Sequence, residues 1–167
     1  PYVGLNGSAS GARFFADGRA YLSFGQNDTV TLAGRAQIGS VVGSGLRTTP
    51  PDLLFFSGGG GTVRGQPYQS LSVDLGGNVN VGGRSFIGLS GETRVKAFNK
   101  TSIVLFADAG FIGAGSMPGK DGEWHSGAGL GLRYETGVGP IRLDIAAPVS
   151  GNTGDGVQIY VGIGQAF

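Results

Sequence analysis

The sequence of 167 residues has no cysteine, only 14 % charged residues and a formal net charge of +1. The lack of cysteine excludes a disulfide-stapled domain and a cysteine-ligated metal centre. The near-zero net charge argues against a nucleic-acid-binding protein, which needs a basic surface. The apolar runs are much shorter than the ~20 residues of a transmembrane helix. Because the chain begins at Pro1, without an initiator Met or a charged-then-apolar leader, we expect a processed product or a piece of a longer protein.

Signatures of catalysis are also lacking. The sequence has neither a Gly-x-Ser-x-Gly nucleophile elbow nor a His-Glu-x-x-His zinc motif. Its one histidine, His125, follows Trp124, and we expect it in a solvent-exposed loop. We therefore predict a protein that is not an enzyme, with no catalytic residue, no cofactor and no metal site.

Glycine and a period of two dominate what the sequence does contain. Its 35 glycines disfavour helices, while apolar residues recur at every second position over stretches of about ten residues. This alternation predicts an all-β, antiparallel protein with eight strands. The predicted strands lie at about 2–14, 19–26, 29–42, 84–98, 101–113, 126–136, 140–147 and 157–167. We expect a turn at Ala16-Asp17-Gly18 between the first two, and residues 43–83 form one long connection.

Charged residues of four consecutive predicted strands fall on one face, opposite an apolar face. They are four acids and four bases: Glu92, Arg94, Lys96, Asp108, Arg133, Glu135, Arg142 and Asp144. Such a balanced set can pair internally. A soluble lipocalin-like barrel would turn this charged face to water, whereas a transmembrane barrel turns it to the lumen.

Strand length favours the membrane. Strands that cross a bilayer at a tilt need about 9–11 residues, whereas soluble strands usually have about 5–6. Most of the predicted strands are of the longer kind, and short turns alternate with longer loops. We therefore predict an antiparallel transmembrane β-barrel in contact with membrane lipid, with the turns at Asn27, Asn99 and Gly137 on the periplasmic side.

The long connection has an unusual composition. Its centre, residues 55–69, combines Phe-Phe, four consecutive glycines, Val-Arg-Gly and Pro-Tyr. Flexible glycine linkers rarely contain such residues, so we expect this loop to pack against another part of the molecule. No Gly-Lys-Ser/Thr follows the glycines, which excludes a phosphate-binding loop.

These residues resemble the BamA/TamA superfamily of outer-membrane assembly proteins. The motif Phe-Phe-x-Gly-Gly-x-x-x-Val-Arg-Gly-x-x-Tyr at residues 55–68 is similar to the family's sixth extracellular loop. Phe106-Ala107-Asp108-Ala109-Gly110 matches its Phe-x-Asp-x-Gly strand signature. Three further segments look TamA-like in particular: 127–134, 139–144 and 162–167. The resemblance covers residues 53–167 by motif and residues 1–50 by strand pattern.

The resemblance implies a sixteen-stranded barrel in the bacterial outer membrane, of which residues 1–167 would form the last eight strands. The family's periplasmic POTRA domains, which would contact any inner partner, would lie outside these residues. The implied function is to insert or secrete unfolded β-barrel and autotransporter clients through a lateral gate. The alternatives are a two-partner secretion pore of the same superfamily and a passive eight-stranded barrel. Unpaired edge strands predict that this piece alone dimerises or aggregates.

The resemblance also implies a contact between the loop and the barrel wall. The loop folds back into the barrel, where Arg64 pairs with Asp108, and Glu92 is expected as a second partner. A guanidinium presents its donors in a fixed fork that suits carboxylates. The other motif residues are Val63, Gly65 and Tyr68 in the loop, and Phe106 and Gly110 on the strand.

The last residues resemble an outer-membrane sorting signal, with Gly162, Gly164 and the final Phe167 on the strand that borders the gate. Gln66 departs from the family, which usually has an aromatic residue directly after Val-Arg-Gly. The family's aromatic packing at the loop tip is therefore not carried over to this chain.

Overall fold

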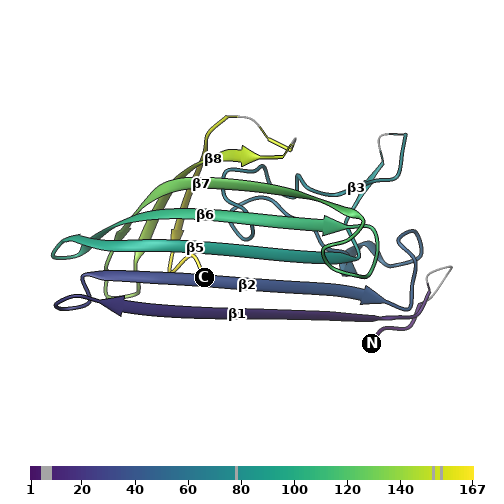
Figure 1. The fold of residues 1–167 in the computed structure, drawn as a ribbon, viewed down its shortest axis with the longest axis horizontal. Coiled ribbons are helices and arrows are strands. Elements are labelled where there is room, and N and C mark those ends of the chain that lie inside the picture. The colour runs from purple at the N-terminus through teal and green to yellow at the C-terminus, as the bar shows by residue number, and fades with distance from the viewer. Residues whose placement is uncertain (5–8, 78, 152, 155) are drawn as a thin grey trace.

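The computed structural model describes residues 1–4, 9–77, 79–151, 153–154 and 156–167, and its main feature is one curved antiparallel sheet (Figure 1). The sheet has seven strands in the order β1-β2-β5-β6-β7-β8-β9. Their bounds are β1 (Ala12–Phe24), β2 (Val30–Val42), β5 (Ser85–Phe98), β6 (Thr101–Gly113), β7 (Gly122–Tyr134), β8 (Ile141–Ser150) and β9 (Gln158–Ile163). The short strands β3 (Val73–Asp74) and β4 (Asn80–Val81) pair separately, and a 3-10 turn spans Pro51–Leu53. None of the described residues form a helix that could cross a bilayer.

The predicted all-β antiparallel class is confirmed, and neighbouring strands of the sheet pair antiparallel. The predicted strands at 29–42, 84–98 and 101–113 agree with β2, β5 and β6 to within one residue. Elsewhere the ends differ, because β7 begins at Gly122 rather than 126 and β8 continues to Ser150 rather than 147.

The expected turn at Ala16-Asp17-Gly18 is wrong. β1 continues through these residues and pairs with β2 along its whole length. The carboxylate of Asp17 does not cap a turn, because the guanidinium of Arg35 on β2 holds it at 2.7 Å across the strand pair. Two predicted strands are therefore one, and the sheet has seven strands instead of eight. Residues 5–8 of the predicted strand at 2–14 lie outside the described part of the chain.

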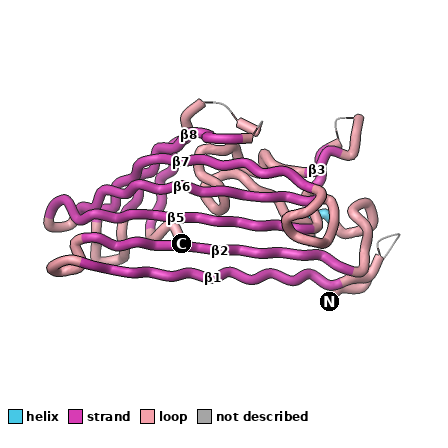
Figure 2. Tube along the Cα trace, viewed as in Figure 1, coloured by secondary structure: helices cyan, strands magenta, loops and turns pink. Residues whose placement is uncertain are grey.

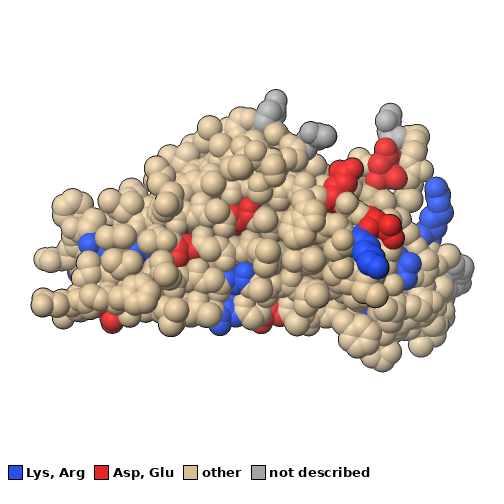
Figure 3. All heavy atoms as spheres, in the orientation of Figure 1, with Lys and Arg blue, Asp and Glu red and all other residues tan. Residues whose placement is uncertain are grey.

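The two faces of the sheet differ as the alternation predicts. On β6, Val104 and Asp108 are buried, whereas Ile103 and Leu105 are 48 % and 60 % exposed. Each strand of the sheet carries at least one exposed apolar side chain of this kind: Leu22, Leu32, Leu89, Leu105, Leu130, Ile145 and Ile159. Uncharged residues predominate on the face shown in Figure 3. An apolar outer face backed by a polar interior is the arrangement of an outer-membrane barrel.

The connections also alternate in length (Figure 2). Short turns join β1 to β2, β5 to β6, and β7 to β8 at one end of the sheet, at the predicted positions Asn27, Asn99 and Gly137. β9 ends on the same side, because Ile163 pairs with Ile141 next to the last of these turns. The long connection leaves the sheet at the opposite end.

The predicted strand at 157–167 stops early, at Ile163. Gly164 has a φ of +97°, and its N–H donates to the carbonyl of Pro140, so the chain turns out of the sheet here. The tail enters the interior, where Phe167 is buried and its carbonyl accepts a hydrogen bond of 2.6 Å from the Tyr21 hydroxyl of β1. The last four residues are therefore an interior tail and not part of the bordering strand.

The long connection supplies part of the buried apolar core. Phe55 and Leu71 from this connection pack with residues of three strands: Val41, Phe86 and Ile112. The ring of Phe55 stacks on that of Phe86, with centroids 5.8 Å apart. Burial of these large apolar groups fixes the base of the connection against the sheet.

An arginine in the middle of the outer face should impair folding into a membrane. Leu130 is 61 % exposed and lies opposite Leu105 of β6. A cation at the bilayer midplane costs about 2–4 kcal/mol. We expect Leu130→Arg to lower the folded fraction in lipid vesicles, measured by the heat-dependent mobility shift of folded barrels, and Leu130→Ile to fold like the parent. Equal folding of both variants would contradict a lipid-facing position.

Candidate functional site

The long connection turns back over the inner face of the sheet and passes behind β5 to β7 in Figure 1. Two backbone bridges join the two sides of its base, Phe55 with Gly83 and Ser57 with Leu71. At its tip, the N–H of Gly59 donates to the carbonyl of Val63 at 3.1 Å, which closes a tight turn. This turn presents the next residue, Arg64, to the strands.

Arg64 is the centre of a buried network of ion pairs. Its Nε and Nη2 donate to the two carboxylate oxygens of Asp108 at 2.8 and 3.0 Å, a bidentate pair. Its Nη1 donates to Glu92 at 2.6 Å and to Asp144 at 3.3 Å. Its main-chain N–H also donates to Asp108, at 3.0 Å. One loop residue therefore contacts β5, β6 and β8.

Two arginines of the strands complete the network. Arg133 of β7 contacts Glu92 at 3.3 Å and also pairs with Asp144. Arg94 of β5 contacts the second carboxylate oxygen of Glu92 at 2.7 Å. The network thus holds three guanidinium groups and three carboxylates. Because the charges balance and each carboxylate has at least one donor, the network can be buried.

Burial and neighbouring charges shift the pKa of Arg64 in opposite directions. Burial alone would lower the pKa of its guanidinium, but the carboxylates of Asp108 and Glu92 outweigh this effect and raise the pKa above its ordinary value. Arg64 therefore stays charged inside the barrel wall. Removing one partner of a buried pair leaves the other charge uncompensated, which costs about 3–5 kcal/mol.

Phe106, the aromatic residue of the strand signature, contacts the guanidinium of Arg64. Residues two apart on a strand share a face, so Phe106 and Asp108 both point inward. The guanidinium carbon of Arg64 lies 3.6 Å from the centroid of the Phe106 ring. This cation–π contact supports the guanidinium while Asp108 binds its edge.

Glycines on the inner faces of β6 and β7 let the loop approach the wall. A Cβ on Gly127 would lie 2.0 Å from the carbonyl oxygen of Arg64, and a Cβ on Gly110 would lie 2.1 Å from Ser57 Oγ. In the loop, Gly65 has a φ of +92°, and its N–H donates to the Tyr160 hydroxyl at 3.0 Å. The loop therefore packs closely against the inner face at these glycines.

The other residues singled out in the sequence lie in different places. Val63 is fully buried near Gly110, whereas Tyr68 is 80 % exposed and lies outside the ion-pair network. Gly162 pairs with Arg142 at the end of the sheet. Phe167, in the interior tail, lies with its ring centroid 5.9 Å from the guanidinium carbon of Arg94.

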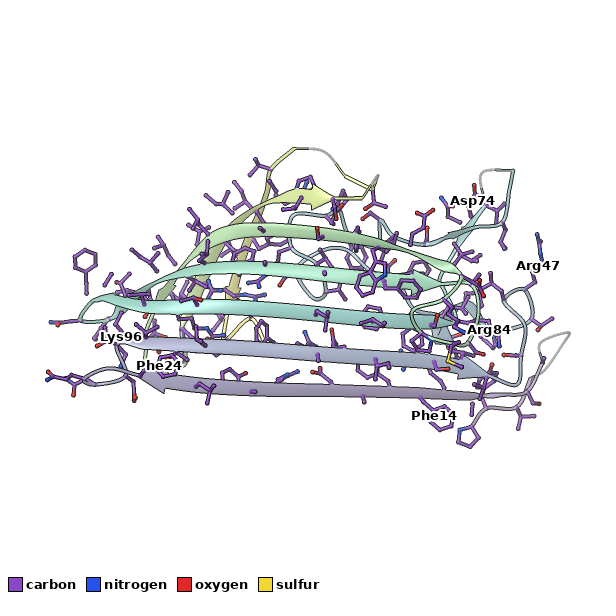
Figure 4. All side chains as sticks on the ribbon, in the orientation of Figure 1. Phe14, Phe24, Arg47, Asp74, Arg84 and Lys96 are labelled. Atoms are coloured by element: carbon purple, nitrogen blue, oxygen red, sulfur yellow. The ribbon has the colours of Figure 1, made fainter. Side chains whose placement is uncertain are left out.

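Sequence reasoning did not assign Asp144, Arg133 and Tyr160 to the loop contact. For Asp144 and Arg133 a signal was present in the sequence, because both belong to the charged face that the alternation of polar and apolar residues defines. Not every member of that face joins the network. Lys96 lies near the end of the sheet with the short turns (Figure 4), where its Nζ donates to the carbonyl of Asn27.

The expected exposed position of His125 is wrong. His125 lies on β7 and is fully buried. β7 begins four residues earlier than predicted and pairs with β6 from Gly122 onward, which carries the histidine into the sheet. Its ring lies between Ser57 of the long connection and Thr153 of the β8–β9 connection.

The curved sheet, its apolar outer face and its charged interior define the wall of a transmembrane β-barrel. The family model of the Omp85 superfamily domain matches residues 2–167, and the chain belongs to this superfamily. This membership indicates the bacterial outer membrane.

The fold is similar to that of a solved member of the superfamily. BamA from Haemophilus ducreyi lacking POTRA domains 1–3 matches with a TM-score of 0.68 and 18 % sequence identity. The match covers 87 % of this chain and 33 % of that chain. The chain therefore spans about a third of the length of the structure that it matches.

A methyl group at Gly127 should displace the loop. Its Cβ would meet the Arg64 carbonyl, whereas a Cβ on Gly91 of β5, on the outer face, has no atom within 4 Å among the described residues. Overpacking of a dense interior typically costs about 1–3 kcal/mol. We expect Gly127→Ala to lower the denaturation temperature in detergent, and Gly91→Ala to leave it unchanged. If both variants unfold at the parent temperature, the loop does not lie against β7.

Proposed function

We propose that the chain is the C-terminal part of the barrel of a TamA-like outer-membrane assembly factor, in which the docked loop braces the wall while clients insert at a seam. The observation that carries this proposal is the position of Arg64 between carboxylates of β5, β6 and β8. A loop fixed to three strands stiffens this part of the wall. Movement that admits a client is then confined to a less constrained strand.

β9 has the properties of such a strand. Its pairing with β8 spans only the six residues Gln158–Ile163, and Gly162 contributes no side chain to the sheet. A short strand at the border of the sheet opens at little cost, and its edge offers N–H and C=O groups to an incoming client strand. The proposed mechanism is strand exchange at this edge, without a chemical step or a cofactor, and its clients are unfolded outer-membrane proteins.

The interior argues against two of the alternatives. A soluble lipocalin-like binder needs its charged face in water, whereas the charged groups around Arg64 are buried and the apolar face is exposed. A passive eight-stranded barrel has no use for a loop anchored to three strands. The two-partner secretion pore differs from an assembly factor in its client, which it exports and does not insert.

Removal of Arg64 or Asp108 should impair assembly. We expect Arg64→Ala and Asp108→Ala to reduce the amount of folded outer-membrane client about tenfold or more, because each change leaves buried charges uncompensated at a cost of about 3–5 kcal/mol. The measurement is the heat-shifted client fraction in cells whose only copy of the full-length protein carries the variant.

Arg47→Ala is the matched control. Arg47 lies on the same long connection but at its outer end, where it points away from the sheet (Figure 4). Normal client assembly by both interior variants would remove the bracing role. Loss of the export of one soluble partner, with outer-membrane proteins assembled normally, would instead identify a secretion pore.

A further inference from the structure

A second set of contacts reaches the loop tip beside Arg64. Gln66 is fully buried, and its Nε2 donates to the carbonyl oxygens of Ser126 at 2.8 Å and Ser150 at 3.1 Å. Its Oε1 accepts a hydrogen bond of 2.8 Å from the hydroxyl of Thr153. Gln66 therefore joins the loop to β7, to β8 and to the connection between β8 and β9.

The hydrogen bonds continue from Thr153 back to the long connection. Thr153 Oγ1 lies 2.8 Å from Nδ1 of His125, and His125 Nε2 lies 2.7 Å from Ser57 Oγ. Ser57 and Gln66 both belong to the long connection, eight of whose residues lie between them. The chain of contacts Gln66–Thr153–His125–Ser57 thus begins and ends on the same loop.

Gln66 determines the direction of these hydrogen bonds as far as Nδ1 of His125, and the direction of the last one, to Ser57, follows for a neutral imidazole ring. Carbonyl oxygens only accept, so the amide NH2 must face Ser126 and Ser150, and Oε1 must face Thr153 as an acceptor. The Thr153 hydroxyl therefore donates its one proton to Gln66 and accepts from Nδ1–H of His125. A neutral ring with its proton on Nδ1 leaves Nε2 to accept from the Ser57 hydroxyl.

The β8–β9 connection is shaped for this contact. A Cβ on Gly151, whose φ is +97°, would lie 2.6 Å from the Cβ of His125. A Cβ on Gly154 would lie 2.4 Å from Pro67 and 3.0 Å from Gln66 Oε1. Gly151 and Gly154, one on each side of Thr153, thus allow the connection to approach both His125 and the loop tip.

We propose that Gln66, His125 and Thr153 are positioning residues, which form a second, uncharged anchor for the long loop and tie its tip to the β8–β9 connection. Ser57 and His125 are fully buried, so this serine–histidine pair is closed to a substrate and acts on the loop alone. Because Thr153 belongs to the connection, withdrawal of that connection breaks the anchor. The β8–β9 connection thereby controls how firmly the loop is docked, and the consequence for client assembly rests on the function proposed above.

Trypsin provides a direct test of docking. The bond between Arg64 and Gly65 is cleavable only when Arg64 leaves the network. In the full-length protein in outer membranes, we expect Thr153→Val, which keeps the shape but removes the hydroxyl and both of its hydrogen bonds, to raise the rate of cleavage after Arg64 about tenfold or more. The product is identified by mass spectrometry of the peptide that begins at Gly65.

Two control variants isolate the hydroxyl. Thr153→Ser retains it and should restore the parent rate, and Thr101→Val makes the same change at the start of β6, at the opposite end of the sheet, without effect. Parent-like protection of Thr153→Val would overturn the proposal, and so would cleavage of Thr153→Ser at the rate of Thr153→Val. Proteolysis does not depend on client assembly, so this test stands even if the proposed function fails.

The direction of the hydrogen bonds that His125 makes with Thr153 and Ser57 has a separate test. In the full-length protein labelled with 15N-histidine, His125, the one histidine of residues 1–167, is assigned as the signal that disappears in His125→Gln. We expect the imidazole nitrogen shifts of a neutral ring protonated at Nδ1, the less common tautomer in solution. A ring protonated at Nε2 would overturn the proposed direction and with it the role of Gln66.

Discussion

The structure depends on the burial of one charge, the guanidinium of Arg64. A buried cation must be matched by anions held at hydrogen-bond distance, since water cannot reach it. That requirement explains why Glu92, Asp108 and Asp144 point inward from three different strands toward a single position. It also explains the glycines of the inner face, because side chains larger than hydrogen at Gly127 would keep the loop too far away.

The two faces of the sheet thus differ in the partners that their side chains need. The outer face carries apolar side chains and needs no polar partner, as suits a surface in contact with lipid. The inner face holds balanced charges and a chain of neutral hydrogen bonds, both of which end on the long connection. The ion pairs join the loop to β5, β6 and β8, and the neutral hydrogen bonds link it to the β8–β9 connection. Both depend on residues far apart in the sequence that the sheet register brings together.

Much of this could be predicted from the sequence. The period of two predicts the strand class and both faces, and the family resemblance implies the contact of Arg64 with Asp108 and Glu92. Register could not be predicted, because it is set by pairing over long separations, so Asp144 and Arg133 were not assigned to Arg64. Local turn signals were misleading at Asp17, whose carboxylate serves a cross-strand arginine. His125 was misplaced because β7 begins early, and the inward tail because Gly164 leaves the sheet.

Disulfide trapping of the docked loop tests the central claim most directly. The chain has no cysteine, and a Cβ on Gly60 would lie 3.1 Å from the Tyr160 ring, so Gly60→Cys and Tyr160→Cys place two thiols close together without touching the ion pairs. In the full-length protein in intact outer membranes, we predict efficient crosslinking with Arg64 present and little crosslinking when Arg64→Ala is added. Equal crosslinking in both backgrounds would contradict the claim that Arg64 holds the loop. An absence of crosslinking in both would show that the loop does not lie inside the barrel.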